Sequence, residues 1–159
     1  MIRPAAPSDI PSCVRVITAS FQTVADEFHI TRENAPRFTA FATDENRLLY
    51  QMHVEKRPMF VYVLDDIIVG YVSLSLSETT CEINNLSVLP EYRRMGIGGK
   101  LLDYSKTQAK NAGRRTLTLS LVDENTRLKA WYRQKGFIQT HTAKYDFFPF
   151  TCAYMEMDL

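Results

Sequence analysis

A chain of 159 residues is large enough to bury one hydrophobic core, and we expect a single domain over residues 1–159. Its apolar fraction of 45% and charged fraction of 23% are those of an ordinary globular protein, and a formal net charge of +1 argues against a nucleic-acid-binding surface. No segment has the length and apolarity of a membrane span or a signal-peptide core. We therefore expect a cytoplasmic protein without nucleic-acid or membrane partners.

The N-terminal region predicts a short strand and a long amphipathic helix. Met1–Arg3 fits the strand, and Ser8 and Asp9 are N-cap residues for the helix. Its apolar residues recur at helical spacing, at Ile10, Cys13, Val14, Val16, Ile17 and Phe21.

Two further helices are expected before residue 60. Thr31–Asn34 predicts a helix start, with Pro36 in the first turn, where a missing N–H costs nothing. The next helix is expected from about Asp44 to Glu55, and Pro58 ends it.

The middle of the chain changes to the two-residue period of strands. Three strands are expected, at Met59–Leu64, Ile67–Leu76 and Cys81–Val88. Asp65 and Asp66 predict a hairpin turn between the first two, and Pro90 ends the third.

The last third alternates helices and strands. The expected elements are a helix from about Gly98 to Ala112, a strand at Thr116–Val122, a helix from Asn125 to about Lys135, and strands at Phe137–Phe147 and Cys152–Asp158. Gly113 and Gly136 suit the two helix ends. This order indicates a layered α/β (α+β) fold, with a mixed, mostly antiparallel sheet of about six to seven strands flanked by helices.

Neither cysteines nor histidines show a ligand or disulfide pattern. They stand far apart, at Cys13, Cys81, Cys152, His29, His53 and His141. We expect free, partly buried thiols and no metal site.

The most informative stretch is Arg93–Lys100, Arg-Arg-Met-Gly-Ile-Gly-Gly-Lys, between a predicted strand and a predicted helix. Free N–H groups at a helix start attract anions, and glycines let a phosphate approach the backbone. The spacing fits neither a P-loop, because Leu101 follows Lys100, nor a dinucleotide fingerprint. It fits [Gln/Arg]-x-x-Gly-x-[Gly/Ala] and resembles the acetyl-CoA pyrophosphate loop of the GNAT (general N-acetyltransferase) superfamily. For this loop alone, a simple strand-to-helix turn is the alternative.

A second motif supports the resemblance. Asn125–Phe137 contains Asn, Ala, Tyr and Gly-Phe in the order of the second GNAT signature. Asn125 and Tyr132 are two helical turns apart, so they share a face and could look into one cleft. Singly, Asn125 also suits a helix start and Tyr132 a core position. With both motifs, the order of elements resembles the GNAT topology along nearly the whole chain.

The resemblance implies an acetyltransferase that moves the acetyl group of acetyl-CoA to a primary amine by direct attack in a ternary complex, without metal. It implies that the strand before the glycine loop pairs with the pantetheine arm and that the loop holds the pyrophosphate. The cofactor-binding residues it implies are Leu86, Ser87, Val88, Arg93, Arg94, Met95, Gly96, Ile97, Gly98, Gly99, Lys100, Asn125, Lys129 and Tyr132. A solvated side chain is the alternative for Arg94.

Two residues are candidates for catalysis. Glu82 stands where several relatives of the family carry a catalytic glutamate and could take the amine proton, directly or through water. An exposed strand residue or an ion-pair partner is the alternative, and Asn84 could orient the water or amine instead. The Tyr132 phenol, with an ordinary pKa of about 10, could donate to the leaving thiolate. Glu82, Asn84 and Leu86 share a strand face unless a bulge, which the family typically has, shifts the register.

The acceptor amine is not identified by the sequence, and a small molecule and a peptide both stay open. The resemblance places the acceptor beside aromatic and histidine residues, at Phe28, His29, Phe38, Phe41, Tyr145, Phe147, Phe148 and Phe150. These form either an apolar wall near the amine or, as the more ordinary interpretation, core packing. The alternative function is a non-catalytic acyl-CoA-binding sensor or interaction module. A homodimer through the C-terminal strands is one oligomeric state open to the chain.

Overall fold

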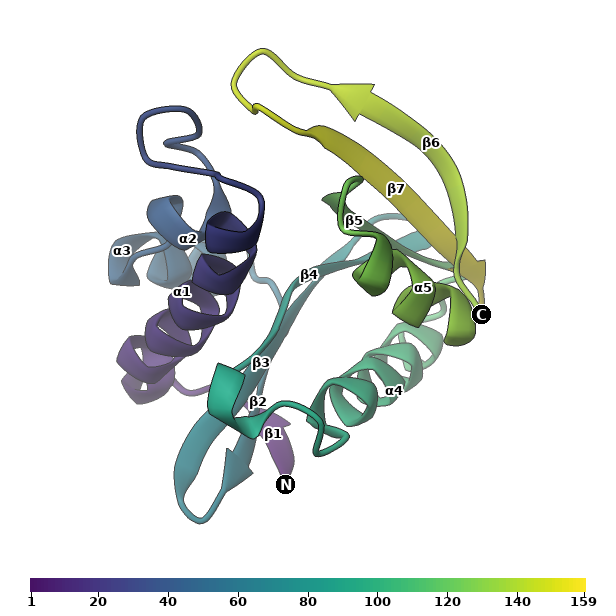
Figure 1. Ribbon diagram of the computed structural model, residues 1–159. Helices are drawn as coiled ribbons and strands as arrows, with labels where there is room; N and C mark the ends of the chain where they lie inside the picture. Colours follow the sequence, from purple (N-terminus) through teal and green to yellow (C-terminus); the bar gives the residue numbers. More distant parts are fainter.

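The computed structural model describes all 159 residues and shows one mixed sheet with helices on both faces (Figure 1). The strands are β1 (Ile2–Pro4), β2 (Met59–Leu64), β3 (Ile67–Leu76), β4 (Thr80–Val88), β5 (Thr116–Val122), β6 (Ile138–Lys144) and β7 (Thr151–Asp158). The helices are α1 (Ile10–Glu27), α2 (Thr39–Ala42), α3 (Glu45–His53), α4 (Ile97–Asn111) and α5 (Thr126–Gln134), with 3₁₀ turns at Pro7–Asp9 and Pro90–Tyr92. The predicted fold class is confirmed, with seven strands.

The sheet has the order β1-β2-β3-β4-β5-β7-β6, and only the β4–β5 pair is parallel. That pair joins just three residues of each strand, Thr80–Glu82 and Thr116–Thr118. Beyond Glu82 the two strands diverge, and in Figure 1 the β2–β4 half of the sheet spreads away from the β5–β7 half. The backbone of β4 that faces β5 is therefore without a sheet partner over its last six residues, 83–88.

A β-bulge in β4 changes which side chains share a face. Tyr71 pairs with Ser87 and Ser73 with Asn84, so Val72 of β3 stands opposite two residues, Asn85 and Leu86. Asn85 takes a left-handed φ of 54°, which asparagine tolerates. The predicted bulge is present, and it places Leu86 and Val88 on the face opposite Glu82 and Asn84.

Helices cover the two faces of the sheet from different parts of the chain. α1 contacts β3 and β4 on one face, whereas α4 contacts the same strands on the other (Figure 1). Ile10 and Val16 of α1 and Leu101 and Leu102 of α4 are fully buried in the main core. A smaller cluster around Phe38 and Phe150 joins the segment before α2 to the segment before β7.

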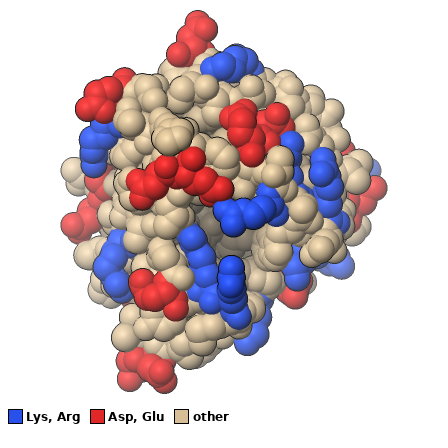
Figure 2. Space-filling model, in the orientation of Figure 1, with Lys and Arg blue, Asp and Glu red and all other residues tan.

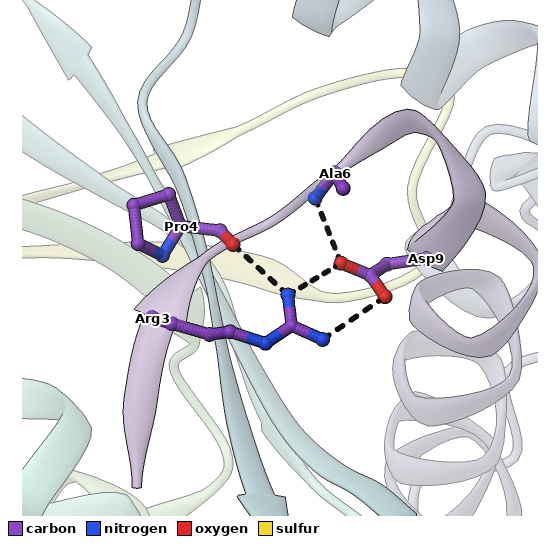
Figure 3. Close-up of polar contacts among 4 residues, drawn as sticks. All are labelled: Arg3, Pro4, Ala6 and Asp9. Atoms are coloured by element: carbon purple, nitrogen blue, oxygen red, sulfur yellow. Dashed lines mark hydrogen bonds and ion pairs between the residues drawn. The ribbon is translucent and has the colours of Figure 1, made fainter.

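The start of α1 is fixed to β1 by one carboxylate. Asp9 accepts hydrogen bonds from both terminal nitrogens of Arg3, at 2.7 and 3.2 Å, and from the Ala6 N–H at 2.7 Å (Figure 3). Arg3 also donates to the Pro4 carbonyl. The hydrogen bond from Arg3 lowers the pKa of Asp9 below its ordinary value. Asp9, predicted as a capping residue, thus orients the chain entering α1.

One predicted helix start is wrong. The Asn34 side chain accepts from the Thr31 N–H and donates to the His29 carbonyl, and Thr31 Oγ1 accepts from the Asn34 N–H. These bonds close a turn, and the next helix begins only at Thr39. The side-chain chemistry that caps helices here satisfies a loop instead.

The hairpin turn at Asp65 and Asp66 is confirmed, since both have positive φ. The helix predicted from Gly98 begins one residue earlier, at Ile97. The two closing strands are confirmed, but the first is shorter than the expected Phe137–Phe147, since β6 covers only Ile138–Lys144.

We predict that Gly70→Ala destabilises the fold, because β3 touches α4 there. A Cβ on Gly70 would lie 2.9 Å from Leu101 Cδ1 and 3.2 Å from Ile97 Cγ2. The free energy of unfolding in urea should fall by about 1–3 kcal/mol.

Gly98→Ala is the control, since its nearest atoms lie 3.8 Å away. Its urea midpoint should stay level or rise, because alanine is the better helix former. Equal losses in the two variants would contradict the close approach at Gly70.

Candidate functional site

The glycine loop ends in an exposed helix N-terminus. Arg94 and Gly96 have positive φ of 66° and 78°, and Gly96 is the N-cap of α4. The first backbone bond of the helix runs from the Lys100 N–H to the Gly96 carbonyl, at 3.1 Å. The amides of residues 97–99 precede it and have no partner inside the helix. They and the helix dipole together attract an anion.

Arg93 fastens this loop to α1. Its guanidinium donates to Thr23 Oγ1, to the Ser20 carbonyl and to Ser20 Oγ, each at 3.1 Å. Partial burial lowers the pKa of Arg93 from its ordinary value. Arg93 and Arg94 are both exposed, but Arg93 makes three donor contacts to α1.

A groove of about 560 Å³ runs from the loop between α1 and α5. Figure 2 shows a hollow near the middle of this face, with Lys and Arg side chains around it. Most of the predicted cofactor residues line the groove, namely Leu86, Val88, Arg93, Arg94, Gly96, Ile97, Gly98, Gly99, Asn125 and Tyr132. The divergence of β4 from β5 thus brings the two sequence motifs to one groove.

Four predicted residues lie outside the groove lining. Ser87 is buried with its hydroxyl donating to the Asn85 carbonyl, and Met95 is exposed to solvent. The Lys100 ammonium lies over an aromatic ring of β2, and the Lys129 ammonium pairs with Asp123 at 2.7 Å. The structure does not bring these side chains to the other candidates.

The structure also places residues beside the loop that sequence reasoning missed. The Lys135 ammonium lies 3.4 Å from the Cβ position of Gly99 and 5.5 Å from the Trp131 ring centroid. Trp131 stands over Gly98. Both belong to the second motif, and their four-residue spacing on a helix was the signal that could have found them.

The α5 motif presents one polar and one phenolic side chain to the groove. Asn125 caps the helix, its side-chain oxygen accepting from the Leu128 N–H at 3.3 Å. Tyr132 is 7% exposed, and its ring meets Trp131 and Phe137 edge to face. Burial raises the pKa of the Tyr132 hydroxyl, so it stays protonated at neutral pH.

A second cavity of about 240 Å³, which we call the chamber, lies next to the groove. The chamber lies where β4 and β5 part, between Asn85 and Leu86 of the bulge and residues 119–122 of β5. Six residues line both spaces, namely Phe21, Val24, Leu86, Asn125, Leu128 and Tyr132. The groove that begins at the anion site and the chamber thus adjoin each other, with these six residues between or around both.

Glu82 lies beside the chamber rather than in its lining. It is exposed and occupies the last β4 position paired with β5, opposite Thr118. Ser120, two residues beyond Thr118 on the same face of β5, does line the chamber. Asn84 is held away, since its amide donates to Ser75 Oγ at 2.7 Å.

The cysteines are free and buried, as predicted. Burial raises the pKa of Cys13 to about 12 and that of Cys81 to about 11. Cys152 lines the chamber, and burial raises its pKa as well. No three His, Cys, Asp or Glu side chains come together as a metal site would need. None of the helices has the length and apolarity to cross a bilayer.

Comparison with known sequences identifies a family. The family model described as "Acetyltransferase (GNAT) family" matches residues 22–137, well over half of the chain. Over 55 residues the chain is 36% identical to the uncharacterized N-acetyltransferase YhfO of Bacillus subtilis (strain 168). That alignment covers 35% of this chain and 37% of that protein.

Solved structures share the fold along the whole chain. The ribosomal-protein-alanine N-acetyltransferase of Brucella melitensis has a TM-score of 0.76 and 20% identity, covering 100% of this chain and 99% of that one. PaiA N-acetyltransferase of Thermoplasma acidophilum, in complex with coenzyme A, has a TM-score of 0.78 and 19% identity, and the match covers 100% of this chain and 98% of that one. YncA of Salmonella typhimurium, a putative acetyltransferase with its cofactor acetyl-CoA, has a TM-score of 0.75 and 20% identity, and the match covers 100% of this chain and 93% of that one.

We predict that the native thiols react slowly with a disulfide reagent at pH 8. The thiolate is the reactive form, and burial raises the pKa of all three thiols. The absorbance of the thiol released from the reagent should show that all three cysteines react only after denaturation.

The raised pKa values of the three thiols also determine the direction in which stability changes with pH. The folded pKa values exceed the unfolded ones, so the free energy of unfolding should fall as the pH rises above about 9. Fast reaction of a native thiol at pH 8 would contradict the burial.

Proposed function

The chain belongs to the acetyltransferase (GNAT) family, and from this premise we propose that it transfers the acetyl group of acetyl-CoA to a primary amine by direct attack in a ternary complex. One observation carries the proposal. The groove at the free amides of the α4 N-terminus adjoins the chamber at the divergence of β4 and β5, and six residues line both. An elongated cofactor with a diphosphate near one end and a reactive thioester at the other suits this pair of adjoining spaces.

The diphosphate would bind the amides of residues 97–99, each charge-assisted bond contributing about 1.5–3 kcal/mol. Arg94 and Lys135 would add positive charge beside it. Met95 would contribute backbone only, since its side chain is in solvent. Lys100 would first have to leave the aromatic ring it now covers.

The pantetheine arm would take the place that β5 leaves open. Its amides can bond the unpaired backbone of β4 over Leu86, Ser87 and Val88, as an added strand would. The buried hydroxyl of Ser87 takes no part, but its backbone does. Asn125 would face the arm, and Lys129 could reach it only by leaving Asp123.

The amine must lose its proton before it attacks, since its ordinary pKa is about 10.4. No charged side chain lines the chamber, and a weakly polar surrounding favours the neutral amine. Glu82 would receive the proton through water passing Ser120, because it stands beside the chamber rather than in it. Its exposure keeps it in contact with solvent, which can carry the proton away.

Attack of the amine nitrogen on the thioester carbon gives a tetrahedral intermediate. A β4 N–H near Leu86 would meet its oxyanion. The carbon–sulfur bond then breaks, and the Tyr132 hydroxyl would donate to the departing sulfur. The pKa of a thiol is lower than that of a phenol, so Tyr132 stabilises the departing thiolate by a hydrogen bond and keeps its own proton. The proton lost from the amine nitrogen balances the negative charge of the thiolate. The buried, protonated cysteines do not support an acetyl-enzyme.

The direct test of this function is release of coenzyme A thiol from acetyl-CoA across a panel of primary amines. Turnover by at least one amine, with the acetyl group recovered on its nitrogen, is expected. Tight acetyl-CoA binding with no turnover by any amine would instead indicate the non-catalytic binding module.

We predict that Tyr132→Phe lowers kcat by about 10- to 100-fold, the value of one hydrogen bond to a charged group. The KM for acetyl-CoA should change little, because the bond forms only as sulfur departs. Tyr104→Phe is the matched control, since Tyr104 packs on Phe60 and lines neither cavity. A normal kcat for Tyr132→Phe would remove it from the chemistry.

We predict that Glu82→Gln lowers kcat/KM by about 100-fold at neutral pH. The deficit should shrink toward pH 10, where the amine loses its own proton. Glu156→Gln is the control, because Glu156 stands two strands away in the same row, on the other side of Thr118. A deficit that is equal at every pH would show that Glu82 is not the proton acceptor.

A further inference from the structure

The chamber has an uncharged lining with aromatic walls on one side. From it we infer that the acceptor is a small primary amine carried on an aromatic or branched apolar body. This inference rests on the proposed transfer reaction and names the substrate class of the same site. It follows from the ring geometry, the absence of charge and the size of the chamber.

Four phenylalanines form one wall of the chamber, and they come from three separate segments. Phe38 and Phe150 meet edge to face with centroids 5.7 Å apart. Phe148 stacks on Phe150 at 4.7 Å, and Phe21 meets Phe38 at 6.0 Å. A further ring placed among them finds both edges and faces, and each such pair contributes about 0.5–1.5 kcal/mol beyond burial.

Four of the five polar side chains of the lining stand on the other side, whereas the fifth, Thr39, belongs to α2 and follows Phe38 directly. Asn85 comes from β4, Ser120 from β5, and Asn125 and Tyr132 from the α5 motif. The phenyl rings come from α1, the segment before α2 and the segment before β7. An acceptor would therefore direct its nitrogen toward the β4–β5 divergence and its apolar body toward the rings.

No Asp, Glu, Lys, Arg or His lines the chamber. Two charged residues of the surrounding elements are engaged elsewhere: Glu27 pairs with Arg127 at 2.9 Å in the groove, and Arg37 lies over the Phe147 ring at 4.1 Å. A second ammonium or a carboxylate on the acceptor would be buried without a partner, which costs several kcal/mol. Diamines and free amino acids are thus poor acceptors.

The chamber also limits the size of the acceptor. Its 240 Å³ lies below the range of about 300–1,000 Å³ for drug-sized ligands. Two of the three segments that form the aromatic wall, those before α2 and before β7, touch each other through Phe38 with Phe150 and through Arg37 with Phe147. A polypeptide would have to separate these contacts, whereas a small amine would not.

The test compares 2-phenylethylamine with three probes that alter one property each. Phenylalanine adds a carboxylate, putrescine replaces the ring by a second ammonium, and a phenylalanyl peptide amide keeps the ring and adds a chain. We expect kcat/KM for 2-phenylethylamine to exceed each of the others by about 100-fold, the upper range for selection by an apolar pocket. A faster reaction of any of the three would overturn the inference and leave the transferase function standing.

Phe148→Glu and Tyr50→Glu form a matched pair, because each replaces an aromatic side chain by a carboxylate. Phe148 lines the chamber, whereas Tyr50 of α3 is 55% exposed and lines neither cavity. Phe148→Glu should lower kcat/KM for 2-phenylethylamine about 100-fold and reduce the ratio of this kcat/KM to that for putrescine, and Tyr50→Glu should change neither. Equal effects of the two variants would overturn the assignment.

Binding separates this inference from the proposed function. Titration of 2-phenylethylamine into the protein–CoA complex, followed by calorimetry, reports chamber occupancy without turnover. Saturable binding that Phe148→Glu abolishes, with no turnover of acetyl-CoA, would support the chamber assignment and contradict the transferase. Absence of binding by 2-phenylethylamine, with turnover of another amine, would support the transferase and contradict the chamber assignment.

Discussion

The three-residue length of the parallel pairing between β4 and β5 is the constraint on which the site depends. A sheet that stayed paired would satisfy its own backbone and leave no space between its halves. Here α1 and α4 hold β3 and β4 from both faces, while β5 follows β7 along its full length. The cleft is thus fixed by packing on either side, and the unpaired edge of β4 is available to a ligand.

The motifs that identify the family are local, and they were readable for that reason. A helix that opens with Gly96 and two more glycines must expose its first amides, and residues seven apart must share a helix face. Predicting the elements succeeded for the same reason, because the change from helical to strand periodicity marks them. The turn at Thr31–Asn34 shows the limit, since its side chains can cap a helix or close a loop equally well.

Side chains with long-range partners could not be placed from sequence. The position of Lys129 one helical turn after Asn125 predicts a contact with the cofactor, yet its ammonium pairs with Asp123. Arg93 stands in the loop but bonds to α1, seventy residues earlier in the chain. Lys135, which sequence reasoning passed over, lies beside the α4 N-terminus. In each case a tertiary contact, invisible to the local pattern, decides where a long side chain ends.

The β4 edge and the α4 N-terminus are proposed to bind acetyl-CoA together, and amide hydrogen exchange with and without acetyl-CoA reports on both segments at once. On binding, exchange should slow at residues 86–88 and at 97–99, with little change in β2, whose backbone is paired on both sides. Binding without protection at either segment, or with protection only at the α4 N-terminus, would contradict this joint binding.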